Sequence, residues 1–541
     1  MQRFRSRWAA KGVLLAAAAL ATAAGASGAT SIRGASHSSS ASATLVIDRS
    51  FEIKTADPQR AFEPTASIVD RGIYDTFFTY KGNDLAHPIP LLVKSWTASK
   101  NAKTFVFHLR TNVHFADGTP LTAKDAVFSF RRLINLKGNP AFLLDGVTPS
   151  ARGKYTVVLR SKTPNTALPS ILTNTSLGVV NSKLVSKHGG TDAANADKTD
   201  KAERFLNSAA SRGAGSGPYL LQRYSTTSQI TLVPNPRYWG TRKAAFKTVV
   251  VRNMIAATQL INIQRGTHEV AIDLSADQAQ TIKGNKRLNV RTSPSTWIFF
   301  MLANDDPQVS AITSNRHFQA AVRYGLDYSS LVRLGGPGTI QAPGVIPNMF
   351  LGSLPKSAAI KRSLAKARSE LQASGAAGKT ITLEYPSDLT INGVPFPSLA
   401  QRVQANLQQV GFKIDLAGST VGTWLQKYRD GKMAFGLSLW GPDYPDPADY
   451  LVFTPGDLVG LRAGWPKGGD PTTERLAARA RVTTKAKARQ TVFRAIQRRL
   501  NAVGPFFPLI QPTQVFVATK DLRNALFNAQ YQVDVTRVSP K

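Results

Sequence analysis

The chain has 541 residues, of which 68 are Lys or Arg and 33 are Asp or Glu, so its net charge is +35; it contains no cysteine. Its length allows a large buried core in several domains, and 42% hydrophobic with 19% charged residues is typical of a folded protein, not a disordered one. The lack of cysteine excludes disulfides, thiolate metal sites, a cysteine nucleophile and a thioether-linked lipid anchor.

The first 29 residues are typical of a secretory signal peptide. Four basic residues within the first eleven precede the uncharged run 13–24, and small residues with an A-x-A-like pattern follow. The run is shorter than the roughly 20 apolar residues that span a bilayer, although the segment could instead stay in the membrane as an uncleaved anchor. Residues 30–43 are rich in Ser and Ala, which predicts a flexible leader. We therefore expect an extracytoplasmic protein, in a periplasm or at the cell surface, that is not a lipoprotein.

The first half of the body carries clear strand and helix patterns. Residues 44–53 alternate β-branched and polar side chains and predict a strand, and residues 104–109 predict another. Thr122 and Asp125 then form a capping box, which predicts the start of a helix over 123–134.

The second half repeats an order of helix, glycine and strand. An amphipathic helix is predicted over 399–410, Gly411 suits a left-handed helix end, and 412–416 alternates as a strand. The same order occurs within 365–383, and 435–440 predicts a further strand. Strands that alternate with helices of this length predict α/β lobes with mixed sheets.

Several segments resemble catalytic or cofactor-binding motifs but lack the neighbouring secondary structure that those motifs require. Gly378-Lys379-Thr380 lies between a helix and a strand, whereas a phosphate-binding loop needs the reverse order. The glycine-rich segment 213–217 leads into a strand and matches neither a dinucleotide fingerprint nor a nucleophile elbow. The seven histidines include no H-x-x-x-H pair. We therefore expect no metal site, no cofactor and no enzymatic activity.

The positive charge has two interpretations. Its densest stretch, Arg475 to Arg499, alternates basic with apolar residues at helical spacing. This pattern favours a solvated helix face over a nucleic-acid stripe, because no RNA-binding or recognition-helix motif accompanies it. We expect no nucleic-acid partner, while an anionic envelope surface stays open as one.

A set of segments resembles the family 5 extracytoplasmic solute-binding proteins, the peptide-, dipeptide- and nickel-binding components of ABC importers. The most specific is 104–132, TFVFHLRTNVHFADGTPLTAKDAVFSFRR, which is similar to the family signature almost position for position. Other similar segments follow in the family's order over residues 45–515, at 73–78, 90–96, 215–219, 235–239, 318–327 and 440–447.

The resemblance implies a two-lobed α/β periplasmic-binding-protein fold of the type II-like kind, with an extra inserted domain, that closes on its ligand about a hinge. Its expected parts are lobe 1 over 44–70 and 213–296, the inserted domain over 71–212, lobe 2 over 297–512, and a return to lobe 1 over 513–541.

Two aspartates near the end of the 435–440 strand have different expected roles. Asp446 precedes Pro447 and suits the N-cap of a helix. Asp443 has no such task, and in the peptide-binding branch of the family the matching aspartate pairs with the α-ammonium group of the peptide. The alternative for Asp443 is a turn residue that bonds its own backbone.

Aromatic residues supply the other candidates for ligand binding. Trp440 and Tyr444 would offer flat surfaces to the ligand, with core packing as the alternative. Trp297 lies near the expected crossing between lobes, and Tyr74, beside Asp75, is near the cleft in this fold, although helix packing would also explain Tyr74.

The sequence therefore predicts a monomeric binding component that captures short peptides and delivers them to an ABC permease in the membrane. Alternatives are the same fold with another solute, such as an oligosaccharide or a nickel chelate, a secreted peptidase or esterase, or an envelope-binding protein.

Overall fold

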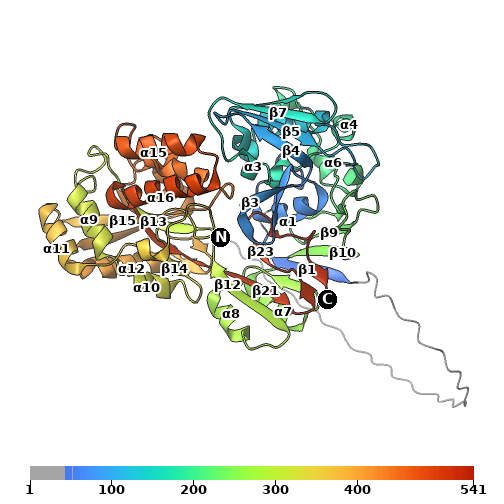
Figure 1. Cartoon of the computed structure of the whole chain (residues 1–541). Helices are drawn as coiled ribbons and strands as arrows, with labels where there is room; N and C mark the ends of the chain where they lie inside the picture. The colour runs from blue at the N-terminus through green and yellow to red at the C-terminus, as the bar shows by residue number, and fades with distance from the viewer. Residues whose placement is uncertain (1–42, 52) are drawn as a thin grey trace, which may run out of the picture. The chain divides into compact units, whose positions relative to one another are not determined.

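A computed structural model of the chain describes residues 43–51 and 53–541 (Figure 1). The predicted signal peptide over 1–29, and the predicted leader apart from its last residue, lie outside the described residues. Within the described part, no helix combines the length and apolar character that crossing a membrane requires.

A seven-stranded mixed sheet is built from distant parts of the chain. In spatial order its strands are β12 (Leu288–Pro294), β21 (Thr513–Thr519), β11 (Glu269–Ala271), β1 (Thr44–Arg49), β10 (Thr248–Asn253), β9 (Gln229–Pro234) and β8 (Tyr219–Arg223). The central strand β1 runs parallel to β10 and β11, while the other pairs are antiparallel. Its flanking helices are α1 (Pro64–Ile73), α7 (Ala256–Arg265) and α8 (Ala276–Ile282).

Strand β1 is shorter than the 44–53 expected. After Arg49 the backbone leaves the sheet, because the N–H of Ser50 donates to the Asp273 carboxylate at 2.7 Å and the N–H of Phe51 donates to the Asn253 side chain at 3.0 Å. These two backbone N–H groups therefore bond to side chains and not to a neighbouring strand.

A six-stranded sheet follows in the second half of the chain. Its strands in spatial order are β14 (Ile340–Gln341), β20 (Phe506–Gln511), β13 (Ile298–Ala303), β19 (Phe435–Trp440), β15 (Thr380–Pro386) and β18 (Lys413–Ser419). Its helices are α9 (Arg316–Gly325), α10 (Tyr328–Leu334), α11 (Leu364–Ala373), α12 (Phe396–Gln408), α13 (Val421–Arg429), α14 (Leu458–Arg462), α15 (Pro471–Val482) and α16 (Ala486–Val503).

The helix and strand bounds predicted for this half lie close to the observed ones. Strand β19 has the expected bounds, and Gly411 has a φ of +113°, in the region that favours glycine. Helix α12 begins three residues before the predicted start, because Pro397 in its first turn is compatible with helical geometry.

A four-stranded antiparallel sheet and α2 (Ala123–Leu136) form a third cluster. The strands in order are β4 (Val93–Ala98), β5 (Thr104–Leu109), β7 (Thr156–Ser161) and β6 (Val147–Ala151). The bounds of β5 are as predicted. The capping box is confirmed, since both the N–H and the hydroxyl of Thr122 donate to the Asp125 carboxylate.

Shorter elements complete the described chain. They are the strands β2 (Phe78–Lys81), β3 (Asp84–Pro90), β16 (Thr390–Ile391), β17 (Val394–Pro395), β22 (Leu522–Arg523), β23 (Phe527–Asn528), β24 (Gln532–Val533) and β25 (Ser539–Pro540), the helices α3 (Leu168–Ile171), α4 (Ser182–Lys187), α5 (Ala196–Thr199) and α6 (Glu203–Leu206), and the 3₁₀ turns η1 (Asn139–Leu144), η2 (Thr175–Leu177), η3 (Ala209–Gly213), η4 (Lys356–Ala358) and η5 (Pro447–Phe453).

Asp75 joins three of the sequence motifs that lie far apart in the chain. Its Oδ2 accepts hydrogen bonds from the Ser216 hydroxyl at 2.9 Å and from the Trp239 indole N–H at 2.8 Å. The glycine-rich segment packs directly on the end of α1, because a Cβ at Gly215 would lie 2.2 Å from the carbonyl oxygen of Ile73. These motifs therefore hold the fold together.

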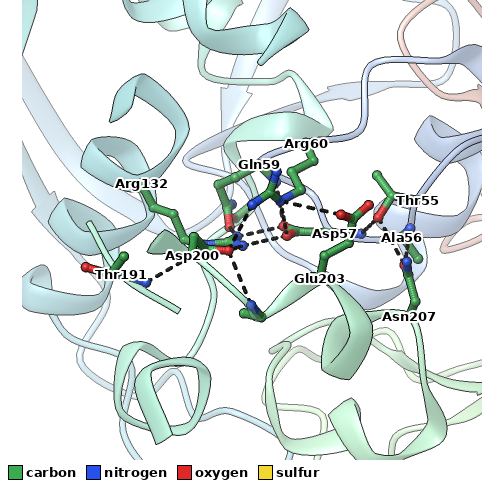
Figure 2. Close-up of polar contacts among 12 residues, drawn as sticks. Thr55, Ala56, Asp57, Gln59, Arg60, Arg132, Thr191, Asp200, Glu203 and Asn207 are labelled. Atoms are coloured by element: carbon green, nitrogen blue, oxygen red, sulfur yellow. Dashed lines mark hydrogen bonds and ion pairs between the residues drawn. The ribbon is translucent and has the colours of Figure 1, made fainter. Parts of the chain in front are cut away.

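A buried ion network fixes the start of the body to α2 (Figure 2). Arg132 is fully buried and donates from Nη2 to Asp57 at 2.5 Å and from Nε to Asp200 at 2.7 Å. Gln59 and Arg60 complete the network. Two carboxylates thus share one guanidinium, which satisfies charges that would be costly to bury alone.

Two segments connect the seven-stranded and six-stranded sheets. One joins β12 to β13 and the other joins β20 to β21, and they lie side by side because the N–H of Ser295 donates to the carbonyl of Pro512 at 2.7 Å. Gln511 is fully buried and donates to the carbonyl of Ser295 at 2.5 Å. The two sheets are therefore linked through a narrow, hydrogen-bonded pair of crossings.

Candidate functional site

The loop that follows β19 forms one wall of a cavity of about 290 Å³. This loop, residues 441–446, leads into η5 and α14, and the opposite wall comes from residues 142–171 next to the four-stranded sheet. The cavity therefore lies where two separately built parts of the chain meet.

Asp443 lines this cavity with a carboxylate that lacks a partner. Within the described residues its side chain accepts no hydrogen bond and forms no ion pair, so the alternative of a self-bonded turn aspartate does not apply. Partial burial raises the pKa of Asp443 to about 6, although the positive charge of Arg462 acts in the opposite direction. A cation in the cavity would stabilise the ionised form of the Asp443 carboxylate.

Asp449 lies beside Asp443 and was not predicted from the sequence. Its side chain is buried, and its Oδ2 accepts hydrogen bonds from the indole N–H of Trp440 at 3.1 Å and from the backbone N–H of Asp443 at 3.4 Å. Burial, together with the negative charge of Asp443, raises the pKa of Asp449 well above its usual range. Two carboxyl groups therefore share this edge of the cavity.

Asp446 is confirmed as a cap and has a second task. Its Oδ1 accepts from the N–H of Ala448 at 2.9 Å, at the start of a 3₁₀ turn and not of the α-helix expected. Arg489 also binds both carboxylate oxygens, at 2.5 and 3.0 Å, and Ser170 donates to Oδ2 at 3.3 Å. Asp446 is thus fully paired and serves to hold the loop.

Arg489 corrects the interpretation of the basic stretch. The stretch is divided between α15 and α16, and Arg475, Arg479 and Arg498 are exposed as expected. Arg489 is instead only 8% exposed, because its guanidinium faces the Asp446 carboxylate. Not every charge in the stretch belongs to a solvated face.

Trp440 and Tyr444 line the cavity and also take part in packing. The Trp440 ring contacts Phe453 edge to face at a centroid distance of 5.9 Å. Tyr444 packs against the apolar cluster of the four-stranded sheet and α2. The two alternatives from the sequence, ligand surface and core packing, therefore coexist in the same side chains.

Trp297 and Tyr74 lie outside the residues that line the cavity. The Trp297 ring lies against Gly441, where a Cβ would come within 2.6 Å of it, so Trp297 supports the loop from behind. Tyr74 is 1% exposed in the core beside the seven-stranded sheet, as the helix-packing alternative for this residue requires. We therefore leave Tyr74 out of the proposed site.

The chemistry of this site suits an organic cation. Within the described residues no group of three or more His, Cys, Asp or Glu side chains is placed to hold a metal ion. A pair of partly desolvated carboxyl groups beside aromatic rings instead suits an ammonium group, which gains from charge-assisted hydrogen bonds where water is scarce.

The wall formed by residues 142–171 is absent from the sequence predictions. Its lining residues Phe142 and Thr166 belong to a 3₁₀ turn and a loop without any motif. Asp449 had one available indication, the spacing of three residues from Asp446, which places both on the same side of a 3₁₀ turn.

Known proteins share the fold. The "Probable D,D-dipeptide-binding periplasmic protein DdpA" of Escherichia coli K12 is 26% identical over 493 residues, which cover 90% of this chain and 91% of that protein. The solved structure of HbpA2 from Haemophilus parasuis has a TM-score of 0.79 at 19% identity and covers 92% of this chain and 100% of that one. The periplasmic binding protein DppA from Helicobacter pylori, solved with the peptide STSA, has a TM-score of 0.69 at 18% identity and covers 92% of this chain and 98% of that one.

These likenesses confirm the predicted α/β fold of the two-lobed periplasmic binding proteins. The model of the bacterial extracellular solute-binding proteins, family 5, matches residues 87–457, more than half of the chain, and the motifs quoted above lie largely within that range. The chain therefore belongs to the family 5 bacterial extracellular solute-binding proteins.

Proposed function

We propose that this protein captures short peptides outside the cytoplasm, holds their amino end at Asp443, and delivers them to the membrane permease of an ABC importer. Two relatives support a peptide ligand: one is named for dipeptide binding, and the other was solved with a bound peptide. In this proposal the protein acts as a monomer and binds its ligand without chemical turnover.

One observation carries the proposal. Asp443 is a partly buried carboxylate in a cavity, burial raises its pKa, and within the described residues it forms no ion pair. An α-ammonium group would supply the missing charge. The buried Asp449 beside it is harder to ionise, because burial and the charge of Asp443 raise its pKa well above the usual range, so Asp443 is the carboxylate proposed to pair with the ligand.

We propose the following domain assignment. Lobe 1 is the seven-stranded sheet with its helices, lobe 2 is the six-stranded sheet with its helices, and the four-stranded sheet and α2 belong to the inserted domain. The paired crossings at Ser295 and Pro512 are the hinge, because within the described residues the chain passes between the two large sheets through these two short segments. A ligand that touches both walls of the cavity would favour the closed arrangement by its differential contacts.

The direct test is calorimetric titration with a tripeptide and its Nα-acetylated form. Acetylation removes the positive charge, so we expect the wild type to bind the acetylated peptide at least tenfold more weakly than the free one. We expect Asp443→Asn to bind the free peptide with a similar loss of affinity. Asp415→Asn, at an exposed position on β18, is the matched control and is expected to bind as the wild type does. Equal binding of the free and acetylated peptides would contradict the role of Asp443.

Native mass spectrometry of the purified protein tests the ligand class and the absence of turnover. We expect a peptide of a few residues to be retained and to be recovered intact after incubation. Recovery of cleaved peptide would indicate a hydrolase, and a retained sugar or metal chelate would indicate another solute.

A further inference from the structure

Two apolar side chains are exposed at the cavity beside Asp443. Among the described residues eight large apolar side chains are exposed, and two of them, Phe142 and Leu458, line this one cavity. Phe142 is 43% exposed and Leu458 is 51% exposed, and they belong to opposite walls. Exposed apolar surface that faces a cavity from two sides indicates an apolar occupant.

The position of Phe142 is fixed by an aromatic contact. It lies in η1, and its ring meets the ring of Phe62 edge to face at a centroid distance of 5.4 Å. Phe62 is itself half-buried, so the Phe142 ring cannot turn inward without losing this contact. The exposed face of Phe142 is therefore a built part of the wall.

Leu458 is held in place by a polar anchor. It is the first residue of α14 and follows Asp457, whose Oδ2 accepts from the Thr454 hydroxyl at 2.6 Å and from Arg481 at 2.8 Å. These bonds tie Asp457, the residue next to Leu458, to the preceding turn and to α15. The second wall is thus anchored beside Leu458.

The size and lining of the cavity suit a single residue. Its volume of about 290 Å³ is at the lower end of the range for small-molecule sites, which fits one amino-acid residue better than a whole peptide. The lining includes the buried apolar residues Leu143, Ile171 and Leu451. It also includes Arg481, whose guanidinium binds the Asp457 carboxylate. The cavity therefore combines apolar side chains with the carboxyl groups of Asp443 and Asp449 and one arginine that is already paired.

We propose that this cavity receives the first residue of the peptide and selects a large apolar side chain, such as that of Phe or Leu. This inference rests on the proposed function, because Asp443 fixes the amino end of the peptide. The ligand class is then a short peptide with a free amino end and an apolar first residue.

The test is a series of tripeptides X-Ala-Ala, measured by titration calorimetry, in which X is Phe, Leu, Ala, Ser, Lys or Glu. Burial of a large apolar side chain predicts that Phe or Leu binds about ten- to a hundredfold more tightly than Ala. A preference for Lys would show that Asp145, a carboxylate on the rim, dominates, and a preference for Ser would show that Thr163 and Thr166 do. Either result, or a flat series, overturns the inference.

Variants connect the preference to the two walls. Phe142→Ser combined with Leu458→Ser is expected to reduce the advantage of Phe-Ala-Ala over Ala-Ala-Ala to threefold or less. Leu461→Ser is the matched control, because Leu461 is 53% exposed on the same helix but does not line the cavity. Retention of the full preference in the double variant would overturn the inference. Failure of the proposed function gives a different pattern, in which acetylation and Asp443→Asn leave the affinity unchanged.

Discussion

The backbone N–H of Asp443 donates a hydrogen bond to Oδ2 of Asp449 at 3.4 Å, which brings two acidic residues together at one edge of the cavity. Asp449 is the more deeply buried, and its pKa is raised well above its usual range. Asp449 is therefore the harder of the two to ionise, and Asp443, with a pKa of about 6, is the first to carry a charge as the pH rises.

The first prediction concerns the pH dependence of peptide binding. Asp443 attracts an ammonium group only when ionised, so affinity is expected to be constant between about pH 7 and 8 and to fall as the pH drops through about 6. One unit below that pKa, a single protonation weakens binding about tenfold. Titration calorimetry at pH 7.5, 6 and 5 measures the profile. Asp443→Asn is expected to bind weakly with a flat profile, and a flat wild-type profile would contradict the assignment.

The second prediction separates the roles of the two carboxyl groups. Asp449→Asn replaces the carboxyl group that is harder to ionise and keeps an acceptor for the Trp440 indole, so affinity is expected to stay within about threefold of the wild type. Asp449→Ala leaves that N–H without its partner and is expected to lower the free energy of unfolding by about 1–3 kcal/mol. Calorimetry and urea unfolding measure the two effects. A loss of affinity in Asp449→Asn as large as in Asp443→Asn would make Asp449 the residue that pairs with the ligand.

Local features could be predicted from the sequence because they depend on neighbouring residues. The capping box of Thr122 and Asp125, the bounds of β19 and the cap at Asp446 all follow from spacings of a few residues. The family followed from motifs with equally local spacing. One of these, Asp75 with Ser216 and Trp239, has a structural basis in hydrogen bonds that hold the fold together.

The composition of the site could not be predicted because it depends on contacts between distant residues. Asp446 was understood only as a cap, yet its carboxylate also binds Arg489 and Ser170, which are remote in the chain. Phe142 belongs to no motif and becomes part of a wall only because its segment faces the loop after β19. Tyr74 matched a motif near the cleft in related folds, but its ring is needed in the core.

The third prediction concerns Asp70, a fully buried carboxyl group on α1. Neither of its oxygens has a hydrogen-bond partner among the described residues. Burial, with the charges of Asp57 and Glu63 nearby, raises its pKa well above the usual value. The folded state therefore binds this proton more tightly than the unfolded state does, and the resulting stabilisation is lost as the pH rises from about 4 toward the folded-state pKa.

Asp70→Asn tests this directly, because the amide does not titrate. Relative to this variant, the wild type is expected to lose up to about 1.4 kcal/mol of unfolding free energy for each pH unit over that range. Urea unfolding of both proteins at pH 5, 6.5 and 8 gives the difference. Asp415→Asn, at an exposed carboxylate, is expected to show no such slope. Parallel pH profiles for the wild type and Asp70→Asn would contradict the prediction.

The fourth prediction concerns the buried ion network around Arg132. Arg132→Met removes the shared guanidinium and leaves the carboxylates of Asp57 and Asp200 buried beside each other, with only Arg60 at their edge. Breaking a buried pair in this way is expected to lower the free energy of unfolding by about 3–5 kcal/mol.

Two neighbouring arginines are matched controls for Arg132. Arg60→Met removes a partly exposed member of the same network, and its expected cost is about 1 kcal/mol or less. Arg131→Met, at the exposed position next in the chain, is expected to leave stability nearly unchanged. Urea unfolding of the three variants ranks them by their free energy of unfolding. If Arg132→Met were no less stable than Arg60→Met, relaxation of the surroundings or proton uptake by Asp57 and Asp200 would have removed the buried charge, and the network would not be what holds α2 to the start of the body.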